Sequence, residues 1–418
     1  MTCTLVQERD QPLLYDAVSR AVCRGDAFAV LDPTWPQPFL NVAAGQVRGA
    51  VSAGVVGDGD LVVFSSGSTG RPRGIVRTVE SWRSSVAAFS DISGITDDDT
   101  VWLPGALWSS LFLYGAFHAG AVGAQVVLRD DQTPGVTALH CVPSQIPGLL
   151  QRAGSGGLPL LRTVVVAGDH CAGTLRQRCE AAGWRVVEYY GASELSFVAW
   201  RERSGPFRAF PGVEIELRPQ IEPGRETERR TETDVRNETD LRNETDVRNE
   251  TDLRNETELT QGVLWARSHY LADRYLTDQP DGPLRFDPLG WATVQDVARV
   301  APGGLEIIGR GDNAVTSGGH TVVVEEVERL LRGLPDVDEV AVLGLPHPRL
   351  GQVLTAVVVG SAVDGTLRRA VAGMPAPSRP RRWVHADALP RTSAGKLRRD
   401  ALPDLVVTLS ERARLSNP

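Results

Sequence analysis

The sequence lacks the features that mark secreted, membrane-spanning and zinc-binding proteins. Its five cysteines are odd in number and include no C-x-x-C pair, so we expect reduced thiols, without a zinc site. No run approaches the roughly 18 apolar residues that a membrane-spanning helix needs. The first ten residues contain no apolar core of signal-peptide length. These absences predict a cytoplasmic protein with no membrane partner.

Charge and composition exclude a further class of function. The formal net charge of the 418 residues is −8 at pH 7, whereas binding to nucleic acid needs clustered Lys and Arg. Hydrophobic residues make up 42% and charged residues 23% of the chain, as in ordinary globular proteins. We therefore expect two or three folded domains and no nucleic-acid partner.

A loop rich in small residues is the first candidate site. It follows the apolar run 60–64, which predicts a buried strand, and it reads Ser65-Ser66-Gly67-Ser68-Thr69-Gly70-Arg71-Pro72-Arg73-Gly74. The glycines allow a tight turn, and hydroxyls with exposed N–H groups form a concave surface suited to phosphate. No Gly-Lys-Ser/Thr closes the loop, which excludes the P-loop of NTPases. Taken alone, such a loop is more often a plain turn.

Short β-branched runs alternate with helix-length segments between residues 78 and 200. Bounded by Gly or Pro, they predict βαβ units and a mainly parallel sheet, in which ligands collect beyond the carboxyl ends of the strands. Earlier in the chain we expect a helix over 13–23 and a strand over 27–31. The four later runs are 101–103, 124–128, 163–167 and 185–189.

The last of these runs leads into a second candidate site, Tyr189-Tyr190-Gly191-Ala192-Ser193-Glu194-Leu195-Ser196. The ring of Tyr190 can stack on adenine, Gly191 lets a base approach the backbone, and the carboxylate of Glu194 can hold magnesium. In isolation, a packed aromatic and a surface acid would be the commoner interpretation.

Residues 225–259 differ in kind from the rest of the chain. From Arg236 they repeat Arg-Asn-Glu-Thr-Asp-Val/Leu in four copies that end at Leu259. A period of six places the aliphatic residues on no single helix face, and one aliphatic residue per copy buries little as a strand. We therefore expect a disordered insert that expands a loop between two strands, 213–217 and 262–266.

Five separated elements together resemble, in order, the adenylate-forming superfamily of acyl-CoA synthetases, peptide-synthetase adenylation domains and luciferases. The small-residue loop resembles the phosphate loop of that family, and 190–194 resembles Tyr-Gly-x-Thr-Glu with Ser193 in place of Thr. The other three are Thr293-Val294-Gln295-Asp296 for Thr-Gly-Asp, Gly309-Arg310-Gly311-Asp312 for Gly-Arg-x-Asp, and 390–396 for Pro-x-Thr-x-x-Gly-Lys.

This resemblance implies an AMP-forming acid-thiol ligase that uses ATP, Mg²⁺ and CoA. Lys396 would bridge the carboxylate and the α-phosphate, and Glu194 would hold Mg²⁺. Asp296 would accept the ribose hydroxyls, with Arg310 nearby, while Ser66, Ser68, Thr69 and Arg73 would cradle the pyrophosphate. The remaining ATP-binding candidates are Ser65, Gly67, Gly70, Tyr190, Gly191 and Ser193.

The implied fold is α/β, with a large, mainly parallel α/β N-terminal domain over 1–311 and a small α+β C-terminal domain over 312–418. Asp312 would be the hinge about which the small domain rotates between the two steps. That rotation would withdraw Lys396 and present Gly318 and Gly319, which resemble the pantetheine-channel loop of aryl- and acyl-CoA ligases.

Several departures leave the substrate open. Most of the lobe that precedes the phosphate loop in the family must be absent, as in some short acyl-CoA ligases. Trp108 stands near the usual pocket His, and Gly168-Asp169-His170 departs from the common Gly-Gly pattern, so Trp108, Gly168 and Ala192 are weak candidates for a pocket that takes a small carboxylic acid. Two alternatives remain: an enzyme that loads the phosphopantetheine of a carrier protein or another nucleophile, and an inactive relative that binds a nucleotide or a partner.

Overall fold

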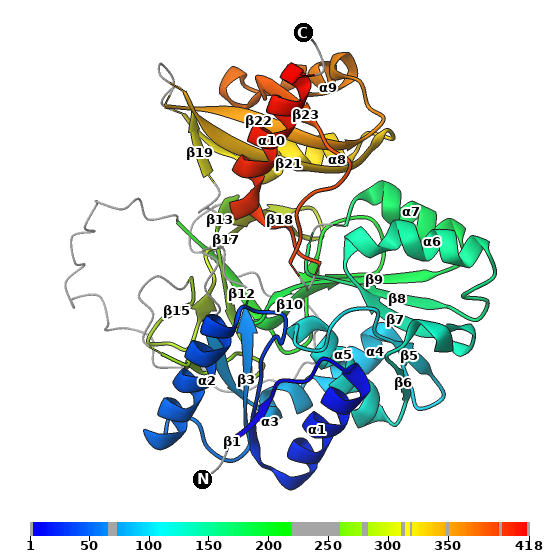
Figure 1. Cartoon of the computed structure of the whole chain (residues 1–418), viewed down its shortest axis with the longest axis vertical. Helices are drawn as coiled ribbons and strands as arrows, with labels where there is room; N and C mark the ends of the chain where they lie inside the picture. Colours follow the sequence, from blue (N-terminus) through cyan, green and yellow to red (C-terminus); the bar gives the residue numbers. More distant parts are fainter. Residues whose placement is uncertain are drawn as a thin grey trace, which may run out of the picture.

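The computed structural model describes residues 3–65, 73–169, 171–219, 260–277, 283–310, 314–317, 320–347, 351–392 and 395–415. Their strands form four sheets, three of them within the first 310 residues. The fourth sheet and its helices, here called the C-terminal domain, lie together at the top of Figure 1. Within the described ranges, none of the helices combines the length and apolar character required to cross a lipid bilayer.

The first sheet carries the strands that flank the small-residue loop. Its order is β1-β2-β3-β4-β14, in which the first three strands are parallel, whereas β3 and β4 form an antiparallel hairpin. Alternate residues pack on opposite faces, with Val62 against α2 and Leu61 against the main core. The elements are β1 (Cys3–Val6), α1 (Gln11–Arg24), β2 (Ala27–Val30), α2 (Gln37–Ser52), β3 (Asp60–Ser65), β4 (Arg73–Thr78) and β14 (Arg274–Tyr275).

The second sheet confirms the predicted α/β architecture. Its order is β11-β10-β9-β8-β7-β5-β6, and the five strands from β9 to β6 are all parallel. Helices α6 and α7 cover one face and α4 and α5 the other (Figure 1). The elements are α3 (Val79–Arg83), α4 (Val86–Ser93), β5 (Thr100–Trp102), α5 (Ser110–Val122), β6 (Gln125–Val127), β7 (Ala138–Cys141), α6 (Ile146–Gly154), β8 (Thr163–Val166), α7 (Gly173–Ala181), β9 (Arg185–Ala192), β10 (Ser196–Arg201) and β11 (Arg208–Ala209).

The third sheet is antiparallel, so the parallel pattern does not extend through the whole large domain. Two of its strand pairs, β15–β16 and β17–β18, are joined by connections of a few residues, whereas a parallel crossover needs a dozen or more. The two strands predicted on either side of the insert are present as β12 and β13 and pair with each other. The insert itself, 225–259, lies outside the described residues. The elements are β12 (Glu214–Arg218), β13 (Gln261–Arg267), β15 (Arg285–Phe286), β16 (Ala292–Thr293), β17 (Asp296–Ala301) and β18 (Gly304–Arg310).

The C-terminal domain has hydrophobic cores of its own on both faces of its sheet. In β21, Val340 and Val342 face α8, while Ala341 faces α10 on the other side. Such alternation buries both faces of a strand. The boundary proposed at residue 312 falls on undescribed residues and stays a prediction. The elements are β19 (Ala314–Ser317), β20 (His320–Val323), α8 (Val324–Arg332), β21 (Val337–His347), β22 (Gly351–Gly360), α9 (Asp364–Ala370), β23 (Arg382–His385) and α10 (Leu402–Leu415).

Two histidines are buried in the main core between the second sheet and its helices. The ring of His140 has no hydrogen-bond partner on either nitrogen among the described residues and lies 5.7 Å from the ring of Phe89. Burial lowers the pKa of His140 to about 3, with a smaller contribution from His118, and lowers the pKa of His118 to about 4. Both rings are therefore neutral in the folded protein at neutral pH.

We predict that His140→Phe makes the protein less sensitive to acid. The unfolded chain takes up a proton near pH 6.5 but the folded one does not, so stability is full above that pH and falls on acidification. For each such histidine the loss is roughly 1.4 kcal/mol per pH unit. Urea unfolding at stepped pH from 7 to 4 should give a shallower loss for His140→Phe. The exposed His385→Gln is the control, and equal slopes for His140→Phe and wild type would contradict the prediction.

Candidate functional site

The β9–β10 hairpin carries five of the predicted site residues: Tyr190, Gly191 and Ala192 end β9, and Ser193 and Glu194 lie in the turn. A Cβ added at Gly191 would lie 1.8 Å from the carbonyl oxygen of Ser196, across the hairpin. The hairpin itself therefore requires glycine here, independently of any ligand. Ser196 has a positive φ of 56°, which lets the chain enter β10 directly after Glu194 and Leu195.

Glu194 is 4% exposed and joins this turn to the first sheet. The hydroxyl of Tyr275, in β14, donates to its Oε1 at 3.0 Å, and the N–H of Ala272 donates to its carbonyl oxygen at 2.8 Å. Burial, followed by the charge of Glu194, raises the pKa of the Tyr275 hydroxyl, which thus stays a proton donor. The buried Arg73 acts on the same Tyr275 through its positive charge. Arg73 and Glu194, predicted to bind phosphates and magnesium, therefore lie in one neighbourhood.

Arg77, which the sequence analysis missed, is 1% exposed and lies beneath the turn. Its guanidinium donates to the carbonyl oxygen of Ser193 at 3.1 Å, to the hydroxyl of Ser196 at 2.5 Å and to the carbonyl oxygen of Tyr270. Burial lowers its pKa to about 9, opposed by Asp273 and Glu194, so it stays charged at pH 7. One signal was available, because Arg77 follows two aliphatic residues in a strand that is otherwise buried.

Three predicted nucleotide-binding residues meet at the start of the third sheet. The hydroxyl of Tyr190 donates to Oδ2 of Asp296 at 2.5 Å, across 106 residues of chain. Asp296 is the backbone partner of Arg310 in the β17–β18 ladder. This arrangement places an aromatic ring beside a carboxylate, as the binding of a nucleoside requires.

Gln295, the residue that replaces the usual glycine, has a positive φ of 65°. Its N–H donates to the hydroxyl of Thr293 at 2.9 Å, and that hydroxyl donates to the carbonyl oxygen of Leu264 at 2.6 Å. The turn thus adopts a conformation that glycine enters readily, and the glutamine side chain is accommodated at the cost of backbone strain.

Lys396, the only lysine in the sequence, extends from the C-terminal domain into a cavity of about 50 Å³. Its loop is held by Arg391, which donates to the carbonyl oxygen of Gly395 at 2.6 Å and to Glu339 at 2.8 Å. A Cβ added at Gly168, whose φ is +88°, would lie 3.7 Å from Cε of Lys396. The cavity therefore lies where the lysine loop meets the carboxyl end of β8 and the β9–β10 turn.

The weak pocket candidates are only partly brought together. Gly168 and Ala192 line the cavity, together with Gly191, Ser193 and Arg77. The hydroxyl of Ser193, predicted to bind ATP, lies 2.6 Å from that of Ser110 at the start of α5. Trp108 is not among the described lining residues and packs, half-buried, against the main core.

Several predicted site residues lie outside the described residues and stay predictions. For Ser65 the structure gives the backbone, at the end of β3 opposite Arg73, and for Arg310 likewise the backbone alone. The undescribed residues are Ser66, Gly67, Ser68, Thr69, Gly70, Asp312, Gly318 and Gly319.

The positive φ at Gln295 predicts how substitutions at this position change the stability of the protein. Gln295→Val should lower the free energy of unfolding by about 1–3 kcal/mol, because a β-branched residue is strained at positive φ. Gln295→Gly should be close to neutral, since relief of strain offsets the greater freedom of the unfolded chain. At the exposed Gln125 in β6 the order should reverse, with Val tolerated and Gly destabilising. Chemical denaturation of the four variants tests this, and the same order at both positions would refute it.

Two stretches of the chain match known protein families. Residues 51–276 match the model of the AMP-binding enzyme family, and residues 326–396 match the AMP-binding enzyme C-terminal domain. An uncharacterized acyl–CoA ligase of Bacillus subtilis, YhfT, is 30% identical over 80% of this chain and 66% of its own length. A salicylyl-CoA synthase / salicylate adenylyltransferase of a Streptomyces species is 27% identical over 83% of this chain and 63% of its own. The chain thus spans less than two thirds of the length of these two relatives.

Solved structures agree on the fold. ATP-bound MatB from Rhodopseudomonas palustris superposes with a TM-score of 0.73, covering 96% of this chain and 88% of that one, at 18% sequence identity. The family model spans more than half of the chain, and the resemblance seen in the sequence is confirmed: the chain belongs to the AMP-binding enzyme family.

Proposed function

We propose that the protein joins a carboxylic acid to the thiol of CoA in two steps driven by ATP. A carboxylate oxygen attacks the α-phosphorus, the bond to the bridging oxygen breaks, and pyrophosphate leaves. The thiol sulfur then attacks the acyl carbon, and AMP leaves. The observation that carries the proposal is the position of Lys396, in a cavity bordered by the β9–β10 hairpin, which carries Tyr190 and Glu194.

Lys396 would act in the first step by electrostatics. A carboxylate and the α-phosphate are both negative, and the transition state concentrates further charge between them. An ammonium group that contacts the carboxylate and the α-phosphate together offsets their repulsion and stabilises the transition state. The cavity supports this role because it is lined by the lysine and by small residues, including Gly168 and Ala192, which leave room for a reacting group.

Glu194 is suited to magnesium, which would neutralise phosphate charge and orient the leaving pyrophosphate. Magnesium commonly binds one or two carboxylates together with substrate phosphates. Among the described residues no group of three or more His, Cys, Asp and Glu side chains could hold a metal ion. An ion at Glu194 would therefore take its other ligands from the nucleotide and water.

The nucleotide would lie along the junction of the second and third sheets. Tyr190 would contact adenine, and Asp296 would accept the ribose hydroxyls, with Arg310 nearby. The loop 65–73 would hold the departing phosphates, and Arg73, buried at its end, supports this placement. The Tyr190–Asp296 hydrogen bond supports the shared role, because it fixes the ring beside the carboxylate.

The second step would require a different arrangement of the domains. We propose that the two domains divide between residues 311 and 312 and that the C-terminal domain rotates about Asp312. This rotation would withdraw Lys396 and bring Gly318 and Gly319 close to the thiol. In support, the C-terminal domain has hydrophobic cores made of its own residues.

CoA is the preferred acceptor because both curated relatives carry a CoA ligase or synthase name. The adenylyltransferase name of the Streptomyces relative keeps a carrier protein as the alternative. For the acid, the small volume of the cavity and its aromatic lining, which includes Trp82, Tyr114 and Phe197, favour a short-chain or aryl acid over a long fatty acid.

Pyrophosphate release with ATP and magnesium tests this function. A panel of short-chain, aryl, amino and long-chain fatty acids should give release with at least one short-chain or aryl acid, and CoA should then yield a thioester. Release without a thioester would favour a carrier protein or another acceptor. No release with any acid would favour a relative that only binds a nucleotide or a partner.

Lys396→Ala should separate the two steps. Formation of the adenylate should fall by about 10²–10³-fold, the loss expected when one preorganised electrostatic contact is removed. Thioester formation from supplied acyl-adenylate should stay near the wild-type rate. Arg398→Ala, two residues away in an exposed ion pair with Asp400, is the control and should alter neither step. Equal losses in both steps for Lys396→Ala would count against the division.

A further inference from the structure

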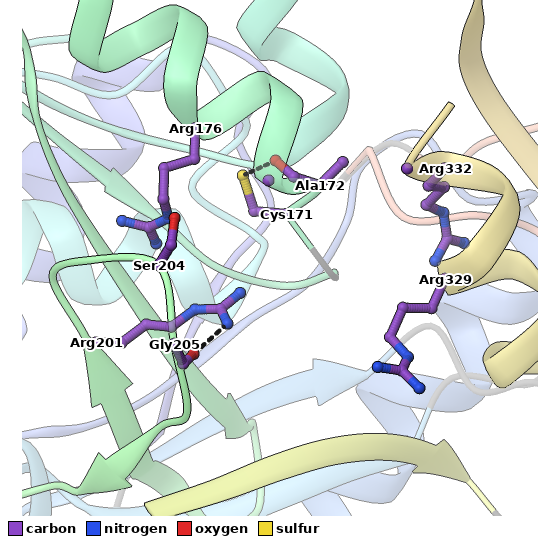
Figure 2. Close-up of a pocket in the computed structure, with 10 residues that line it drawn as sticks. Cys171, Ala172, Arg176, Arg201, Ser204, Gly205, Arg329 and Arg332 are labelled. Atoms are coloured by element: carbon purple, nitrogen blue, oxygen red, sulfur yellow. Dashed lines mark hydrogen bonds between the residues drawn. The ribbon is translucent and has the colours of Figure 1, made fainter. Parts of the chain in front are cut away.

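A second cavity, of about 210 Å³, lies between the large domain and the C-terminal domain. Arg176, Arg201 and the start of α7 at Ala172 line it from the large domain, and Arg329 and Arg332 of α8 line it from the other side. Figure 2 shows Arg201 and Arg329 extending into the same space from opposite sides. We call this space the interdomain cleft.

The arginines of the cleft are incompletely neutralised by their neighbours. Glu188 is shared, lying 2.6 Å from Arg176 and 2.8 Å from Arg201. Glu306 lies 3.8 Å from Arg329 but 2.5 Å from Arg299, outside the lining. Because each of these two carboxylates serves two guanidinium groups, the described side chains around the cleft keep an excess of positive charge.

Arg332 shows the same sharing on the second domain. Its partner Glu328 is 2.8 Å away and equally close to Arg399, which also lies 3.8 Å from Glu325. On the opposite wall, α7 begins after Ala172, whose side chain offers no acceptor to the first turn. Backbone N–H groups at a helix start add positive potential to that of the arginines.

We propose that the interdomain cleft binds a phosphate-type dianion and that binding holds the two domains in the arrangement seen here. Guanidinium groups match the oxygens of phosphate in geometry and charge. Orthophosphate and pyrophosphate share this chemistry, and both are candidate ligands. The site is separate from the cavity of Lys396, and its occupation requires no turnover.

Such an anion would act on the position of Lys396 through the domain arrangement. A ligand shifts an equilibrium only if it binds one state better. The cleft has walls from both domains, so it is complete only when α8 lies against the large domain, which is also when Lys396 lies in its cavity. Bound phosphate should therefore shield Lys396 from reagents in solution in part, since the residue stays exposed in this arrangement.

The single lysine makes this shielding measurable. An acetylating reagent specific for amines can modify only Lys396 and the α-amino group, and mass spectrometry of peptides separates the two. The α-amino group serves as an internal standard for the reagent. The rate at Lys396 then reports the domain arrangement without any assay of activity.

The test compares Arg329→Gln with Arg368→Gln. Both arginines are about half exposed, and each has a carboxylate oxygen at 3.8 Å, but Arg368 lies in α9, outside the cleft lining. Calorimetric titration with orthophosphate, and separately with pyrophosphate, is done at constant ionic strength set with sodium chloride. Loss of one charged contact should raise the Kd at least about tenfold in Arg329→Gln. Arg368→Gln should match wild type.

In parallel, orthophosphate should slow acetylation of Lys396 several-fold in wild type and Arg368→Gln but not in Arg329→Gln. Tighter binding of pyrophosphate, lost in Arg329→Gln, would identify it as the better ligand. Unchanged phosphate affinity in Arg329→Gln would overturn the site. If phosphate binds but leaves the acetylation rate of Lys396 unchanged, the proposed coupling to the domain arrangement is wrong. If added chloride slows acetylation as much as phosphate does, the slowing is due to charge screening and the proposal is wrong. These outcomes can be interpreted even if the pyrophosphate-release assay fails, because neither measurement depends on turnover.

Discussion

The geometry of the site depends on the buried guanidinium of Arg77. A charge removed from water is costly unless its donors find acceptors, and Arg77 finds one on Ser81 and three on segments more than 100 residues away along the chain. Two of these acceptors, on Ser193 and Ser196, lie on either side of Glu194. The planar group can satisfy them together only if the β9–β10 turn lies against β4. Because β4 is also the strand that follows the small-residue loop, this one cation fixes Glu194 relative to the strands that flank the loop.

Much of the fold could be predicted from the sequence because its signals are local. The runs at 101–103, 124–128, 163–167 and 185–189 each overlap a strand of the parallel sheet, and the strands expected on either side of the insert are β12 and β13. Which strands pair with each other is not a local signal and could not be predicted in this way. The β3–β4 hairpin and the antiparallel third sheet arise from pairings that the pattern of single strands does not contain. Arg77 was missed for the same reason, since its partners are distant in sequence.

The candidate site shows the same limit at the level of side chains. The motifs marked Tyr190 and Asp296 separately, but their hydrogen bond, across 106 residues, is a property of how two sheets meet. Gly191 was expected to make room for a base, whereas its space is filled by the carbonyl of Ser196. Gln295 stands where the family motif has glycine, and the structure places strain in its backbone. In each case the motif identified the residue, and the fold shows the physical reason why that residue type stands there.

The loop of Lys396 combines internal rigidity with a weaker hold on the large domain. Its shape is fixed within the C-terminal domain, where Arg391 joins Gly395 to Glu339 and the N–H of Thr392 donates to the carbonyl oxygen of Lys396. Its approach to the large domain includes close packing of Gly395 on Val142 and of Lys396 near Gly168. Packing contacts are less directional than hydrogen bonds, so they can be broken without unfolding the loop. A lysine carried in this way can leave its cavity and return to the same place, as the proposed two-step reaction requires.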